Sequence, residues 1–320
     1  MTEVASIDDQ RTLPPIDLTT DLAGVELEHP ILNGSGTFDA IAALRTFGDS
    51  LRSRFPFSAF VSKTITLEPR GGNPPPRLWE TPAGMINSIG LPNKGLAGFL
   101  ENDLPVLTTL PVPLIVSVAG FSHQEFAQLV EGVASRDEVT AVELNVSCPN
   151  VNSGCVIGSD TDEIAALMRL LRPLTSKPLI VKLTPNVSEP QTIATAAERE
   201  GADAISLINT FRAMALHPDT GAPWLGADRG GLSGPAVRAV ALEMTHQVCS
   251  RVSVPVIGMG GIETGQDASD FMAAGARCIA VGTENFRDPA AAVRIRTELS
   301  VLLARRRPNV KSANLRANIG

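Results

Sequence analysis

The segment ELNVSCPN (143–150) sets a cysteine between two asparagines directly after a run of strand-forming residues. A free cysteine thiol has a pKa of about 8.5. The thiol of Cys148 becomes a usable base or nucleophile where its neighbours favour the thiolate form. A lone cysteine is more often an inert packing residue. The residues alone leave Cys148 open between a packing role, a nucleophile and a proton acceptor, and Cys155 competes with it as the reactive thiol.

Two lysines, Lys63 in SKT and Lys182 in VKL, lie within or just after apolar runs. Removing an ammonium group from water is costly unless an anion compensates it. Either lysine alone is compatible with an exposed strand end. The two together favour a cofactor or substrate with delocalised negative charge.

Asparagines form a second group, because Asn145 and Asn209 end apolar runs, whereas Asn93, Asn150 and Asn152 fit ordinary turns. A side-chain amide both donates and accepts hydrogen bonds. Several amides converging on one site suit a planar ligand that alternates C=O and N–H groups.

Glycines are concentrated in GMGGIETGQDA (258–268) and VGTENFRDP (281–289). Glycine allows backbone N–H groups to approach an anion closely, and the last two loops of an α/β barrel often bind phosphate. Glycines also simply end strands. The two loops in this order favour phosphate binding.

These residues all follow short apolar runs that alternate with helical patterns. Near-continuous apolar strands between amphipathic helices predict a parallel sheet covered by helices, and eight such units favour a closed (β/α)8 TIM barrel, whose carboxyl strand ends carry the chemistry. The eight predicted strands are 30–36, 59–64, 114–120, 141–147, 179–185, 204–210, 254–261 and 278–283.

The remaining segments complete the predicted organisation. Residues 16–30 predict an N-terminal β-hairpin turning at Ala23–Gly24 and covering the bottom of the barrel, and 68–95 predicts a long functional loop after strand two. The predicted domain limits are a flexible segment over 1–15, a barrel over 16–305 and a tail over 306–320.

Composition narrows the classes of function. A net charge of −7 disfavours a nucleic-acid partner. Four cysteines in 320 residues do not make a disulfide framework and lack metal-ligand spacing, so we expect no metal and a cytoplasmic location. No signal peptide and no membrane span are predicted.

The chain resembles the class 1 dihydroorotate dehydrogenases over roughly residues 16–300. The resemblance lies in GSGTFD, SKTITLEPRGGNPPPR, NSIGLPNKG, ELNVSCPNV, INT, GGLSGPA and GMGGIETGQDA. It implies an FMN-containing barrel that oxidises dihydroorotate to orotate in pyrimidine biosynthesis, with the C6 hydride passing to flavin N5 and the C5 proton to Cys148.

The resemblance also implies the roles of the other site residues. Lys182 would face the N1–C2=O region of the flavin and stabilise its anionic reduced form, and Lys63 would act in catalysis by bridging flavin and substrate. The implied pyrimidine-binding residues are Lys63, Asn87, Ile89, Gly90, Leu91, Asn145, Asn150, Asn209 and Thr210. The implied FMN-binding residues are Ser35, Gly36, Lys63, Thr64, Asn145, Lys182, Ile208, Gly234, Gly260, Gly261, Gly282 and Thr283.

Within the family the chain is more similar to the NAD-linked class 1B than to the fumarate-linked class 1A. Class 1B implies a separate electron-transfer subunit carrying FAD and a [2Fe–2S] cluster, and the family implies a homodimer. The sequence departs from the class 1B pattern at Gly154–Cys155 and in INTFRAMALHPDTGAPW (208–224). The membrane-associated class 2 has serine where this chain has Cys148.

Three alternatives stand beside this prediction. They are a flavin enzyme acting on another uracil-like base, such as a dihydropyrimidine dehydrogenase module; a tRNA dihydrouridine synthase, which the negative charge disfavours; and a flavin- or phosphate-binding barrel without catalysis. The complete set of Cys148, Lys63 and the asparagines disfavours the last.

Overall fold

The computed structural model describes residues 16–147 and 157–306. The predicted segment 1–15 and, apart from Arg306, the predicted tail 306–320 lie outside the described residues. None of the described helices is both long and apolar enough to cross a membrane.

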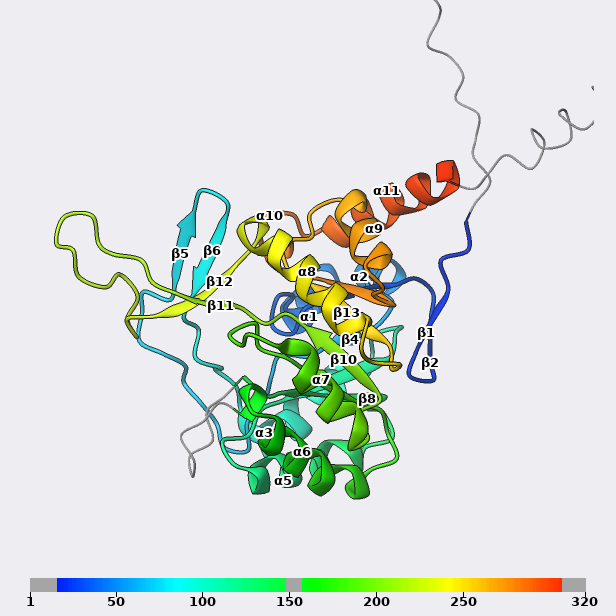
Figure 1. Cartoon of the computed structure of the whole chain (residues 1–320), viewed down its shortest axis with the longest axis horizontal. Helices are drawn as coiled ribbons and strands as arrows, with labels where there is room; N and C mark the ends of the chain where they lie inside the picture. The colour runs from blue at the N-terminus through cyan, green and yellow to red at the C-terminus, as the bar shows by residue number, and fades with distance from the viewer. Residues whose placement is uncertain (1–15, 148–156, 307–320) are drawn as a thin grey trace, which may run out of the picture.

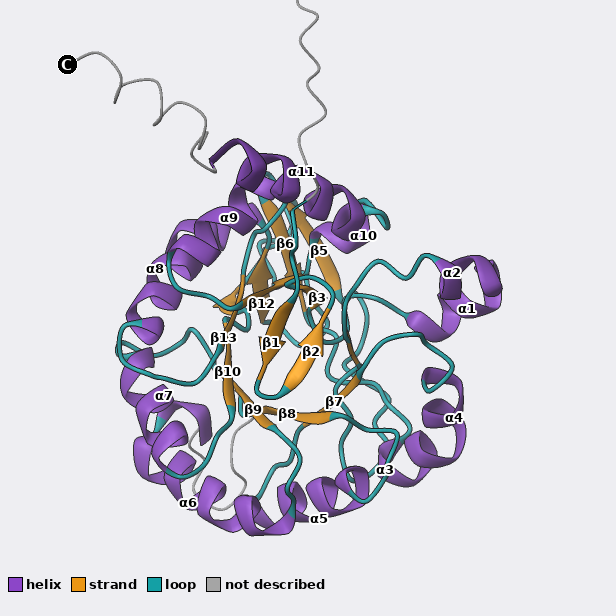
Figure 2. Ribbon diagram, turned by 90° about the vertical axis from the view of Figure 1, so that its right-hand side faces the viewer, coloured by secondary structure: helices purple, strands orange, loops and turns teal. Residues whose placement is uncertain are grey.

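Eight parallel strands form a barrel surrounded by helices, as predicted (Figures 1 and 2). Around the barrel the order is β3, β14, β13, β10, β9, β8, β7 and β4. The strands are β3 (Ile31–Asn33), β4 (Phe60–Val61), β7 (Leu114–Val118), β8 (Ala141–Asn145), β9 (Leu179–Lys182), β10 (Ala204–Leu207), β13 (Val256–Met259) and β14 (Cys278–Val281).

A side chain completes the barrel between its first two strands. The amide of Asn33 donates to the Val61 carbonyl at 2.7 Å and accepts from the Val61 N–H at 2.9 Å. Ser58 N–H donates to the Ile31 carbonyl at 3.0 Å. Asn33 thus supplies hydrogen bonds where β4 is only two residues long.

The helices pack their apolar faces on the outside of the barrel, and side chains cap several of their first turns. Ser122 and Asp160 accept from first-turn N–H groups, and Thr264 with Asp267 forms a capping box. The helices are α1 (Ala40–Phe47), α2 (Asp49–Ser53), α3 (Gly95–Gly98), α4 (Leu104–Leu107), α5 (His123–Ala134), α6 (Thr161–Leu171), α7 (Pro190–Arg199), α8 (Arg238–Cys249), α9 (Gly265–Ala273), α10 (Glu284–Arg287) and α11 (Ala291–Arg306).

The N-terminal hairpin of β1 (Thr20–Leu22) and β2 (Val25–Leu27) lies across one end of the barrel (Figure 2). Its turn residues Ala23 and Gly24 both have positive φ, 52° and 84°, so the predicted turn is confirmed. Leu22, Val25 and Leu27 pack on inward residues of the barrel strands. The hairpin therefore closes the bottom with an apolar layer.

The segment 68–95 contains more structure than the predicted long loop. Strands β5 (Leu78–Thr81) and β6 (Gly84–Asn87) form a hairpin, which pairs with β12 (Gly230–Ser233) and, through it, β11 (Phe211–Ala213). This four-stranded antiparallel sheet projects from the barrel (Figure 1). A prediction of loop alone was incomplete because short runs flanked by prolines and glycines have little strand signal before their distant partners are known.

Buried His29 gives the fold a specific pH dependence. The side chain is 3% exposed, and its Nδ1 accepts from the Ile31 N–H at 3.3 Å. Burial, and secondarily the charge of Arg296, lowers the pKa of His29 to about 4. The unfolded chain therefore takes up a proton between pH 6.5 and 4 that the folded chain excludes.

We expect the free energy of unfolding to lose up to about 3 kcal/mol through His29 as pH falls from 6.5 to 4, and to keep this contribution above pH 6.5. Replacing His29 with Asn, whose oxygen can accept the same N–H, should flatten the curve in that window. Urea unfolding at a series of pH values measures the difference from wild type. The matched control is Asn in place of His246, which is exposed on α8, and a His29→Asn curve with the wild-type slope would refute the assignment.

Candidate active site

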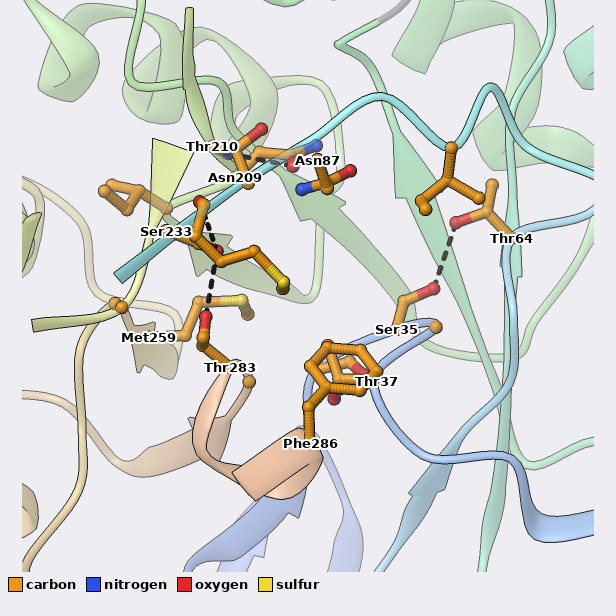
Figure 3. Close-up of a pocket in the computed structure, with 18 of the residues that line it drawn as sticks. Ser35, Thr37, Thr64, Asn87, Asn209, Thr210, Ser233, Met259, Thr283 and Phe286 are labelled. Atoms are coloured by element: carbon orange, nitrogen blue, oxygen red, sulfur yellow. Dashed lines mark hydrogen bonds between the residues drawn. The ribbon is translucent and has the colours of Figure 1, made fainter. Parts of the chain in front are cut away.

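A cavity of about 440 Å³ lies between the carboxyl ends of the barrel strands and the four-stranded sheet (Figure 3). All the described residues predicted to bind FMN or the pyrimidine line it. They are Ser35, Gly36, Lys63, Thr64, Asn87, Ile89, Gly90, Leu91, Asn145, Lys182, Ile208, Asn209, Thr210, Gly234, Gly260, Gly261, Gly282 and Thr283.

Three predicted or competing residues, Cys148, Asn150 and Cys155, lie outside the described residues. The chain enters that segment from Asn145 and Ser147, which contact Asn209: its Nδ2 donates to Asn145 Oδ1 at 3.1 Å and to Ser147 Oγ at 2.9 Å. The strand that leads to Cys148 therefore ends at the cavity wall.

The two glycine-rich loops present free backbone donors at one end of the cavity. Among the hydrogen bonds of residues 16–147 and 157–306, none uses the N–H groups of Gly260, Gly261, Gly282 or Thr283 as donors. At Gly261, with φ 71°, a Cβ would lie 2.7 Å from the Gly234 carbonyl oxygen. These loops therefore combine unused backbone N–H groups with positions that leave no room for a side chain. Such backbone is suited to bind a phosphate oxygen.

Both lysines line the cavity, but their surroundings differ. Lys182 is buried, and its Nζ lies 3.8 Å from Glu143 Oε1. Burial lowers the pKa of Lys63, and the charge of Lys182 lowers it further. Gly36 makes room for Lys63, since a Cβ there would lie 2.8 Å from Lys63 Nζ. The cavity thus concentrates positive charge from two strands.

Below Lys182, Glu143 is held by hydroxyl groups inside the barrel. It is 2% exposed and accepts from Ser117 Oγ at 3.0 Å and from Ser206 Oγ at 3.2 Å. A carboxylate only accepts, so the Ser117 proton points to Glu143. Ser117 Oγ must then accept from Thr64 Oγ1, which lies 3.0 Å away, and Ser35 Oγ lies 3.0 Å beyond Thr64 (Figure 3).

The side of the cavity opposite the barrel comes from the four-stranded sheet. Asn87 on β6 donates to the Gly231 carbonyl at 3.2 Å, and Thr283 Oγ1 donates to Ser233 Oγ at 2.8 Å (Figure 3). The first bond lies within the projecting sheet, and the second ties that sheet to the last barrel loop. The polar groups that face each other across the cavity suit the planar ligand inferred from the asparagines.

Several cavity residues were not found from the sequence. Thr37, Leu78, Met85, Ser233, Met259 and Phe286 line the cavity, and Phe286 is 59% exposed. The buried residues Glu143, Ser117 and Ser206 support it from within the barrel. Glu143 stood in a quoted motif, and a carboxylate inside an apolar strand was the signal that could have found it.

The two cysteines within the described residues are not candidates for the base. Burial raises the pKa of the Cys249 thiol to about 11 and that of Cys278 to about 12. Neither lines the cavity. Within the described part of the chain, no group of three or more His, Cys, Asp or Glu residues is placed to hold a metal ion.

Comparison with known proteins gives the family. Residues 17–303 match the family model described as dihydroorotate dehydrogenase. The chain is 44% identical over 292 residues to the protein of Geobacter sulfurreducens named dihydroorotate dehydrogenase B (NAD(+)), catalytic subunit, covering 90% of this chain and 93% of that one. Proteins of the same name from Bacillus pumilus (44%; 90% and 92%) and Desulforudis audaxviator (45%; 88% and 91%) are similarly close.

The match spans the whole barrel and the cavity at its mouth, and the chain belongs to the dihydroorotate dehydrogenase family.

Proposed function

We propose that the cavity holds FMN beside dihydroorotate, and that the residues named above orient the two. The chain is a dihydroorotate dehydrogenase of the NAD-linked class 1B, which oxidises dihydroorotate to orotate in pyrimidine biosynthesis. One observation carries the proposal for the site: every described residue that the family resemblance assigned to flavin or pyrimidine lines the same cavity.

The residues present fit FMN. The free amides of Gly260, Gly261, Gly282 and Thr283 suit its phosphate, and the buried Lys182 suits the electron-rich edge of its ring. Bound FMN supplies the acceptor for the C6 hydride of the substrate. The protein supplies orientation and charge.

The substrate requires groups of two kinds. Asn87, Asn145 and Asn209 offer amide donors and acceptors to the ring carbonyl and N–H groups, and Lys63 offers a cation to the anionic substrate. In the proposal, the Cys148 thiolate removes the C5 proton while C6 loses its hydride. One proton leaves C5 and one hydride, a hydrogen with its electron pair, leaves C6, and the C5–C6 double bond forms.

The first test is the flavin itself. The purified chain should be yellow and release FMN on denaturation, and dihydroorotate without oxygen should bleach the flavin bands. A chain that binds no flavin, or whose flavin is not bleached, would contradict the proposal.

A matched pair of glycine variants checks that the FMN lies in this cavity. Gly261→Ala places a Cβ against the Gly234 carbonyl at a positive φ and should weaken FMN binding about 5- to 30-fold, because such backbone conformations cost about 1–2 kcal/mol with a side chain. Gly71→Ala, whose Cβ meets nothing within 4 Å, should bind FMN as wild type does.

The second test concerns the proton acceptor. Cys148→Ser should slow flavin reduction by dihydroorotate about 100-fold or more at neutral pH, since general-base catalysis typically contributes that much. The residual rate should rise toward high pH, because a hydroxyl loses its proton less readily than a thiol. Stopped-flow absorbance measures both effects.

Two further cysteines serve as comparisons for Cys148. Cys249 does not line the cavity, so the flavin of Cys249→Ser should be reduced at the wild-type rate. Cys155→Ser decides between the two candidate thiols. A wild-type rate in Cys148→Ser, or a loss confined to Cys155→Ser, would remove Cys148 from the mechanism.

The third test concerns the electron acceptor. The relatives are named as catalytic subunits of an NAD(+) enzyme, which supports a separate electron-transfer subunit carrying FAD and a [2Fe–2S] cluster. The chain alone should reduce a redox dye with dihydroorotate but form NADH only when that subunit is added. Fumarate turnover by the chain alone would favour class 1A.

We also propose an oligomeric state and a cellular compartment. Light scattering of the purified chain should give the mass of a homodimer, the state implied by the family resemblance. The cytoplasm is the proposed compartment, consistent with Cys249 and Cys278 being free thiols.

A further inference from the structure

The buried carboxylate of Glu143 has no place in the chemistry described above. It lies on β8 inside the barrel, is 2% exposed and does not line the cavity. An isolated buried carboxylate is strongly unfavourable, so its partners show what it does. Its contacts are the hydroxyls of Ser117 and Ser206 and the ammonium group of Lys182.

The strand register forces these groups together. On neighbouring strands, Ser117 pairs with Glu143, and Lys182 pairs with both Asn145 and Ser206. Inward positions two residues earlier, Ile115, Ala141, Ile180 and Ala204, belong to the apolar cluster at the bottom. Glu143 is therefore in the first polar layer above that cluster, directly under the cavity.

Glu143 reaches the cavity by two routes. Its Oε1 lies 3.8 Å from Lys182 Nζ, and Lys182 lines the cavity. The same oxygen accepts from Ser117, and the hydroxyl chain continues through Thr64 to Ser35, both of which also line the cavity. Only the first route places an opposite charge beside Glu143.

We propose that Glu143 is a positioning residue that holds the Lys182 ammonium under the cofactor and offsets its charge, so that it sets how strongly the cavity favours the reduced flavin over the oxidised flavin. The proposal rests on FMN binding in this cavity. Lys182 contacts the cofactor, and Glu143 acts through it.

The proposal gives the sign of the effect. Replacing Glu143 with Gln keeps the shape and the hydroxyl contacts but removes the negative charge. The positive charge of Lys182 then acts on the flavin ring without the opposing negative charge of Glu143. Because reduced flavin carries more negative charge at this edge, the reduced form should gain affinity relative to the oxidised form.

The experiment is spectroelectrochemical titration of the FMN-loaded protein. In Glu143→Gln the flavin potential should move in the positive direction by about 30 mV or more, which is a tenfold change in relative affinity for a two-electron couple. Glu143→Asp keeps the charge but withdraws it by one methylene, so its potential should move in the same direction by less. If Glu143→Gln does not fold, Glu143→Asp serves as the test variant. A flavin potential equal to that of wild type in the variant that is measured refutes the proposal.

A structural control separates charge from general damage. Asp203 is also a carboxylate in an ion pair, 2.5 Å from Arg172, but it directly precedes β10 and lies outside the cavity. Asp203→Asn should lower the unfolding temperature and leave the flavin potential near the wild-type value. A shift as large as that of Glu143→Gln would show that any ion-paired carboxylate has this effect and would overturn the inference.

A double-substitution cycle tests whether Glu143 acts through Lys182. In a Lys182→Met background, Glu143→Gln should no longer raise the potential. An undiminished shift in that background would mean that Glu143 acts directly on the flavin. If the wild-type protein binds no flavin, the proposed function fails. If the wild type binds flavin but the Glu143 variants keep its flavin potential, only this inference fails.

Discussion

The burial of the Lys182 ammonium at the mouth of the barrel is the constraint on which the site depends. An ammonium group there needs an anion, and the Glu143 carboxylate supplies it at 3.8 Å. That carboxylate in turn needs donors, which Ser117 on β7 and Ser206 on β10 provide from either side of the β8–β9 pair. Breaking a buried pair by removing one partner typically costs about 3–5 kcal/mol, so these residues must be considered together.

The barrel interior is divided into layers by this requirement. The N-terminal hairpin and alternate residues of the strands fill the bottom with apolar side chains. One step higher on the same strands the inward positions turn polar at Ser117, Glu143, Lys182 and Ser206. The outward positions stay apolar throughout and pack on the helices. The bottom layer therefore stabilises the barrel, while the upper layer places charged side chains directly under the ligand cavity.

Sequence reasoning found the parts of this arrangement that have local signals. Apolar runs identified the eight strands, and Ala23–Gly24 identified the hairpin turn, because both depend on nearby residues. The helical pattern after β3 was weak, and there the structure has two short helices divided at Gly48, which has φ 52°.

Features built from distant segments were beyond that reasoning. The sheet of β5, β6, β12 and β11 joins residues about 140 positions apart, such as Asn87 and Gly231. The role of Glu143 depends on the register of four strands, β7 to β10, which no single run of residues reveals. Cys148 could be singled out from its motif, but its place lies outside the described residues.

The two lysines differ as anion-binding groups because only Lys182 has a carboxylate nearby. Lys182 is compensated by Glu143 from below, whereas among the described residues no carboxylate lies within ion-pair distance of Lys63. Burial lowers the pKa of Lys63, and the repulsion of Lys182 lowers it further. An anion entering the cavity would oppose both effects and raise that pKa again. Lys63 thus gains most from an anionic ligand, because Lys182 already has the Glu143 carboxylate 3.8 Å away, and this difference follows from a single glutamate on β8.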